Sequence, residues 1–167
     1  NALVHFRVRA PPERATQAYA RSHLGRIRKQ GDVYVRTVRV LGVLVALYAA
    51  AKAQRGSRTL DRLRTWCALG EAYLLLGQRH SLQAASDAFR NAESLASMVE
   101  TQAHELMNLK HGYGCTLLEL AAGSNMDLAT EAAARLSSAL ELARKHRPVG
   151  VANIKYELFR AEHTVAQ

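Results

Sequence analysis

Short breaks containing Gly, Pro, Ser or Asn divide this sequence into long segments whose apolar residues recur at helical spacing. Ala, Leu and Arg favour helices and dominate these segments, while proline occurs only three times in 167 residues. The β-branched stretch 33–45 taken alone would suit a strand, but the length and Ala-rich end of its segment favour a helix. We therefore predict an all-α fold of six to seven helices, at about residues 13–29, 33–54, 60–76, 82–97, 99–122, 127–145 and 149–165.

The breaks between these segments are short, so neighbouring helices are expected to run antiparallel and to form a stack of helix hairpins. Thr59 and Ser81 precede two of the segments and are expected to act as N-caps. We predict a single domain over residues 3–167. Its parts are a basic N-terminal helix pair, a first repeat, a second repeat and a terminal helix, at residues 3–56, 57–98, 99–147 and 148–167.

One pair of segments carries a specific spacing of large and small residues. Residues 66–73 read W-x2-L-G-x2-Y, and residues 85–89 read A-x3-F. The small Gly70 and Ala85 would let two helix backbones approach closely, with the large side chains packed around that contact. This pattern resembles the tetratricopeptide repeat (TPR). The resemblance implies a TPR-like right-handed α-solenoid that binds protein partners and carries no catalytic site.

The next unit, at residues 101–146, matches the same pattern poorly. Its candidate counterparts of the motif residues are Gly112, Leu117, Ala132, Leu136 and Ala139. The distance from Phe89 to Leu136 is 47 residues, longer than the about 34 residues of the standard repeat. The chain therefore resembles the divergent, long repeats of bacterial regulatory proteins.

The resemblance also implies where a partner would bind. In stacked helix pairs the first helix of each pair lines the concave face on which partners dock. On this basis the expected groove residues of the two repeats are Arg64, Cys67, Glu71, Leu74, Asn108, His111 and Tyr113.

Positive charge is concentrated at the N-terminal end of the sequence. Residues 1–64 hold 14 Lys and Arg against 3 Asp and Glu, whereas residues 65–167 hold 9 against 11. Such a region suits weak contacts to nucleic-acid phosphates, although cations at a helix end also stabilise that helix through its dipole. The basic patch that would make these contacts consists of Arg21, Arg26, Arg28, Lys29, Arg36 and Arg39.

Side chains that could carry chemistry are few. His104, His111 and Cys115 share one helical stripe with Glu119 beyond them, which suits either a metal site or ordinary groove and core positions. We favour the second interpretation and expect no metal and no cofactor, because the two histidines are two turns apart. The remaining carboxylates, Glu105 among them, are interpreted as solvated charge. Without a nucleophile beside a base, we expect no enzyme.

These features together favour a non-catalytic scaffold for a protein or peptide partner. Two cysteines without a CxxC pair indicate the cytoplasm, and the longest uncharged apolar run, 40–51, is too short to cross a membrane. We expect a piece of a bacterial regulatory or signalling protein. The alternatives are a nucleic-acid-associated transcriptional regulator using the basic helices, and a small-molecule sensor with a pocket at Tyr73, His111 and Tyr113. The apolar residues of the last helix require inward packing, a further repeat or a homodimer.

Overall fold

The computed structural model describes residues 40, 42–43, 46–47, 59–122, 125–146 and 150–166. Most of these residues are helical and none lies in a strand, so the all-α prediction is confirmed for this part of the chain. Residues 40, 42–43 and 46–47 are helical too, as predicted for 33–54. The helix predicted at 13–29 lies outside the described residues. The complete helices are α3 (Thr59–Leu76), α4 (Arg79–Ala96), α5 (Ala103–Ala121), α6 (Met126–His146) and α7 (Val151–Val165).

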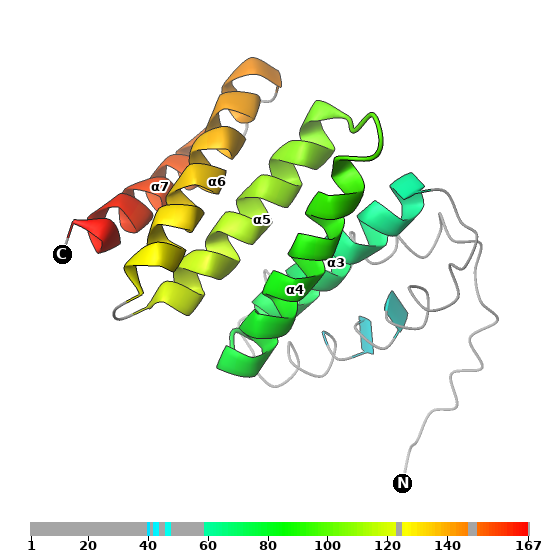
Figure 1. Ribbon diagram of the computed structural model, residues 1–167, viewed down its shortest axis with the longest axis horizontal. Coiled ribbons are helices and arrows are strands. Elements are labelled where there is room, and N and C mark those ends of the chain that lie inside the picture. The colour runs from blue at the N-terminus through cyan, green and yellow to red at the C-terminus, as the bar shows by residue number, and fades with distance from the viewer. Residues whose placement is uncertain are drawn as a thin grey trace, which may run out of the picture.

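The five helices follow one another in chain order, and each runs antiparallel to the one before it, with α3 passing behind α4 and α7 lying behind α6 in Figure 1. Each helix packs against the next, and α5 contacts α3 and α7 as well. The helices α3, α5 and α7 therefore form one row, with α5 between the other two. This arrangement follows from the short connections, because a turn of a few residues leaves the next helix no route except back along its neighbour.

The two predicted N-caps lie inside their helices, and α5 begins at Ala103, four residues after its predicted start. Ser81 is not the N-cap of α4, because Gly77 adopts a positive φ of 67° and the helix begins directly after Gln78. Ser81 lies in the first turn instead, where its Oγ accepts a hydrogen bond from Gln78 N (3.0 Å). Thr59, the other predicted cap, is already the first residue of α3. At α6 the capping acceptor is Asn125, whose Oδ1 accepts a hydrogen bond from Leu128 N (3.2 Å).

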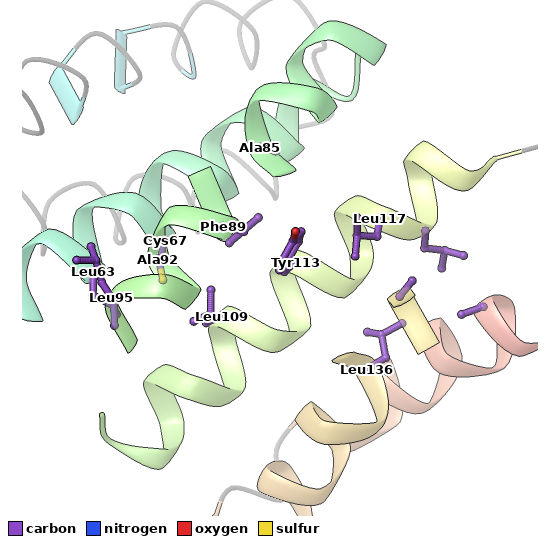
Figure 2. Close-up of a cluster of buried hydrophobic side chains, with 13 residues drawn as sticks. Leu63, Cys67, Ala85, Phe89, Ala92, Leu95, Leu109, Tyr113, Leu117 and Leu136 are labelled. Carbon is purple, nitrogen blue, oxygen red and sulfur yellow. The ribbon is translucent and has the colours of Figure 1, made fainter. Parts of the chain in front are cut away.

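The main core cluster is built around the ring of Phe89, which α4 places between α3 and α5. Phe89 is fully buried, and a Cβ added to Gly70 would lie 2.8 Å from its ring. A Cβ added to Gly112 on α5 would lie 2.7 Å from the same ring. Tyr113 packs beside Phe89 with ring centroids 6.1 Å apart, as Figure 2 shows within the cluster. Two glycines on different helices thus make the space that one aromatic ring fills.

A second close approach joins α5 to α6. A Cβ added to Gly114 would lie 2.7 Å from Leu136 Cγ and 3.3 Å from the carbonyl oxygen of Ala132. Ala132, Ala139 and Leu136 on α6 are all fully buried. Gly114 therefore has the role toward Leu136 that Gly70 has toward Phe89. Gly112, the counterpart that the sequence suggested for Gly70, instead contacts the preceding hairpin.

A group of charged side chains connects α4, α5 and α6. Glu93 Oε1 accepts a hydrogen bond from Lys110 Nζ (2.5 Å), and Glu93 Oε2 accepts one from Arg135 (3.0 Å). The guanidinium of Arg135 also lies over the ring of Tyr113, 4.2 Å from its centroid. Burial by itself raises the pKa of Glu93, but the hydrogen bonds and charges of Lys110 and Arg135 outweigh it and lower that pKa. Glu93 is therefore not the simple solvated charge that the sequence suggested.

The glycine contact predicts the effect of adding one methyl group. We expect Gly112→Ala to lower the free energy of unfolding by about 1–3 kcal/mol, because the fully buried ring of Phe89 cannot move away. Gly42 is the matched control, since it is helical and exposed with no atom within 4 Å of an added Cβ. Gly42→Ala should raise stability by about 0.5–1 kcal/mol. Urea denaturation measures both changes.

A second background makes this prediction specific to the ring. In a Phe89→Leu variant the smaller side chain leaves room for a methyl group. There Gly112→Ala should lower the free energy of unfolding by less than it does in the wild type. If Gly112→Ala lowered the free energy of unfolding equally in the wild type and in Phe89→Leu, the added methyl group would clash with a residue other than Phe89.

The lowered pKa of Glu93 predicts a pH dependence. A carboxylate with a lowered pKa in the folded state contributes stability above its unfolded pKa of about 4.3, and this contribution disappears as the pH falls through the folded value. Glu93→Gln should therefore cost about 1 kcal/mol at neutral pH, a modest value because the side chain is partly exposed. The difference from wild type should shrink below about pH 4.3.

The control for this experiment is Asp87→Asn. Asp87 pairs with Arg90 at 3.3 Å, but both side chains are more than half exposed, so its loss should change stability by only a few tenths of a kcal/mol. Urea denaturation at a series of pH values gives both curves. A cost for Glu93→Gln that stays constant down to strongly acidic pH would contradict the ion-pair explanation.

Candidate functional site

A cleft of about 450 Å³ opens where α3, α4, α5 and α7 meet. Leu74 and Leu82 contribute apolar surface from α3 and α4, on either side of the turn at Gly77. The helices α5 and α7 contribute polar side chains. The residues that line the cleft are Leu74, Gly77, Leu82, His111, Cys115, Glu119, Asn153 and Glu157.

The polar side of the cleft follows from helical spacing. His111, Cys115 and Glu119 are four residues apart on α5, so their side chains form one stripe along that helix. Asn153 and Glu157 have the same spacing on α7. Because α5 and α7 are in contact, the two stripes lie along the same cleft.

One guanidinium holds the two carboxylates of the cleft in place. Arg160 donates to Glu157 Oε2 (2.7 Å) and to Glu119 Oε1 (3.1 Å). Burial by itself lowers the pKa of Arg160, but these two carboxylates outweigh it and raise that pKa above its ordinary value. The three side chains together carry two negative charges and one positive charge. This end of the cleft is therefore acidic and complementary to a cationic group.

The structure places two of the predicted groove residues, Leu74 and His111, in this cleft. For two other residues, Cys67 and Tyr113, the prediction of a groove position was wrong, because both are buried. Cys67 is 7% exposed and packs in the core with Leu63 and Phe89, and Tyr113 is 2% exposed. The reason is the rotation of each helix about its axis, because the close contact of Gly112 with Phe89 turns the adjacent Tyr113 into the core.

Arg64, Glu71 and Asn108 are half-buried but do not line the cleft. Arg64 Nε donates a hydrogen bond to Glu105 Oε1 on α5 (2.5 Å). Glu105 is 3% exposed, so its interpretation as solvated charge was wrong. Arg64 is thus a structural partner of a buried carboxylate.

The sequence did not predict Asn153 and Glu157 as groove residues. The spacing of the stripe from His111 to Glu119 favours groove or core positions over a metal site, and the structure places His111, Cys115 and Glu119 in the cleft wall. His104, the other residue of that hypothesis, does not line the cleft. Within the described ranges no group of three or more His, Cys, Asp or Glu side chains is arranged to hold a metal ion. Asn153 and Glu157 had no signal in the sequence, because only the packing of α7 brings them to α5.

The basic patch of Arg21, Arg26, Arg28, Lys29, Arg36 and Arg39 lies outside the described residues, so the structure does not place it. Among the helices that the structure does describe, none combines the length and the apolar character needed to cross a membrane.

Comparison with family models, with curated proteins and with solved structures found no match to this chain. The resemblance to the tetratricopeptide repeat therefore rests on the residues of this sequence alone.

The buried carboxylate of Glu105 predicts the effect of removing its partner. We expect Arg64→Leu to lower the free energy of unfolding by about 3 kcal/mol, because it leaves a buried charge without its ion pair. The double variant Arg64→Leu/Glu105→Leu removes that charge too and should recover much of the loss. Chemical denaturation of both variants measures this. A double variant less stable than Arg64→Leu alone would show that Glu105 has a stabilising role of its own.

Proposed function

We propose that this chain is a non-catalytic protein-interaction domain with a TPR-like helical repeat, and that its cleft binds a peptide segment of a partner protein. The cleft supports this proposal because its main walls are α5, α7 and the end of α3. These are the first helices of successive hairpins, and in solenoid proteins that row of helices forms the partner-binding face.

Equivalent contacts in the two hairpins support the repeat. If Gly114 is the counterpart of Gly70, then Tyr113 corresponds to Leu69 and Leu117 to Tyr73. Leu69 packs against the described helical residues of the preceding segment, in a cluster with Val40, Val43 and Leu47. Tyr113 likewise packs against Phe89 of the hairpin before it. Each position therefore joins its own hairpin to the preceding one, as expected where repeats stack.

The chemistry of the cleft suggests what kind of peptide it takes. Leu74 and Leu82 offer apolar surface at one side, while Glu119 and Glu157 offer negative charge at the other. A peptide with an apolar side chain next to Lys or Arg would match both sides. The side chains of His111 and Asn153 would supply hydrogen bonds to its backbone or its polar groups.

The uneven distribution of charge favours a second candidate function, a transcriptional regulator segment that contacts nucleic acid through the basic N-terminal helices. The two candidate functions predict a different dependence of binding on the salt concentration. Binding to phosphates weakens steeply as the salt concentration rises, whereas docking on an apolar cleft does not. Titration of a labelled duplex DNA at low and high salt therefore tests the second candidate directly, and no binding at low salt would remove it.

Selection from a displayed library of random peptides tests the first candidate. We expect the wild-type chain to enrich peptides that combine an apolar residue with Lys or Arg. Asn153→Arg should lower the affinity for the selected peptides at least about tenfold, because it places a positive charge in the cleft. This is a loss of about 1.4 kcal/mol of binding free energy. Asn91→Arg is the matched control, since Asn91 is also an exposed helical asparagine but lies outside the cleft.

Fluorescence anisotropy with a labelled selected peptide gives the affinities, and thermal unfolding shows that both variants are folded. Equal affinity of the peptide for the two variants would place its binding site elsewhere. Failure to enrich any peptide would contradict the proposal that the cleft binds extended segments.

A further inference from the structure

The helix α7 has apolar residues on two opposite faces. Its inner face packs into the molecule through Ile154 and Ala161, which are buried. On its outer face, however, Tyr156 and Phe159 are 62% and 65% exposed. Large aromatic side chains this exposed are uncommon on a helix that faces only water, so the outer face has the character of a contact surface.

The outer residues form a continuous stripe along the helix. Ala152, Tyr156, Phe159 and His163 are all exposed and follow each other at intervals of four, three and four residues. This is the spacing of the seam in a two-stranded coiled coil. Within the stripe, the ring of Phe159 stacks on that of His163, with centroids 6.1 Å apart and an interplanar angle of 6°. We call these four residues the α7 stripe.

We propose that the α7 stripe is covered by the α7 stripe of a second copy of this chain, packed antiparallel about a two-fold axis. In this arrangement Tyr156 lies against Phe159 of the second copy, and Ala152 lies against His163 of the second copy. Each contact occurs twice, as two-fold symmetry requires. None of the four stripe residues lines the cleft, although the flanking Asn153 does, and the proposal does not depend on what the cleft binds.

The charged residues beside the stripe are complementary to those of a second copy of this chain. Lys155 and Glu162 are one heptad apart and therefore lie on the same flank of the stripe. Both are exposed, and neither forms an ion pair with another described residue. In an antiparallel pair related by a two-fold axis, like flanks face each other. Lys155 then lies opposite Glu162 of the second copy, and this complementary pair forms twice.

The same charges disfavour a parallel pair. The opposite flank of the stripe carries Asn153 and Arg160. A parallel arrangement brings opposite flanks together and would place Lys155 near Arg160 of the second copy, where two positive charges repel. The antiparallel arrangement places Asn153 near Arg160 of the second copy, with no repulsion.

The size of the stripe sets the expected affinity. A helix of 15 residues is about 22 Å long, and one such pair buries less than the ~1,200 Å² typical of tight dimers. We therefore expect a reversible dimer with a Kd on the order of 10 μM.

Sedimentation equilibrium of the whole chain across the micromolar range tests the proposal. The wild type should dimerise, and Phe159→Glu should abolish the dimer. Lys155→Glu and Glu162→Lys should each weaken it about tenfold, because each replaces two attractive pairs by two repulsive ones. The double exchange Lys155→Glu/Glu162→Lys reverses both charges and should restore the affinity to within about twofold of the wild type.

Met98→Glu is the control for a general effect of surface hydrophobicity. Met98 is 70% exposed but lies after α4, away from the stripe, so this change should leave the dimer intact. Circular dichroism establishes that each variant is folded. A wild type that stays monomeric at all concentrations would overturn the proposal, and so would a double exchange that fails to restore a dimer weakened by the single exchanges.

Discussion

The packing of Phe89 against two glycines is the constraint on which the described structure depends. The ring belongs to α4 but fills space left by Gly70 on α3 and Gly112 on α5, so it fixes how closely three helices approach. Because the ring is fully buried, neither α3 nor α5 can rotate about its axis without forming either a clash with the ring or a cavity beside it. The orientation of α5 then determines which of its residues enter the core and which line the cleft.

Charged residues add a second, directional set of constraints to this apolar core. Glu93 joins α4 to α5 and α6 through Lys110 and Arg135, and Glu105 joins α5 to α3 through Arg64. Ion pairs of this kind contribute little net stability, but breaking one by removing a single partner is costly. They therefore favour one relative position of the helices over neighbouring ones that would bury the same apolar area.

The cleft and the α7 stripe are two results of the same arrangement of helices. The inner face of α7 packs against α6 and α5, which brings Asn153 and Glu157 beside the α5 stripe of His111, Cys115 and Glu119. The outer face of the same helix is left exposed with Tyr156 and Phe159. One helix thus completes the cleft on one side and exposes two aromatic side chains on the other.

In the part of the chain that the structure describes, the sequence by itself determined the helices, most of their boundaries and the small residues at their contacts. Helix propensity, turn residues and periodicity are encoded within a few neighbouring positions. Of the residues that the sequence predicted for a partner-binding groove, Leu74 and His111 line the cleft. Only the tertiary structure decided that Cys67 and Tyr113 are core residues, that Glu105 is buried, and that α7 contributes to the cleft. These outcomes depend on the rotation of each helix about its axis, which is fixed by contacts between residues far apart in the chain.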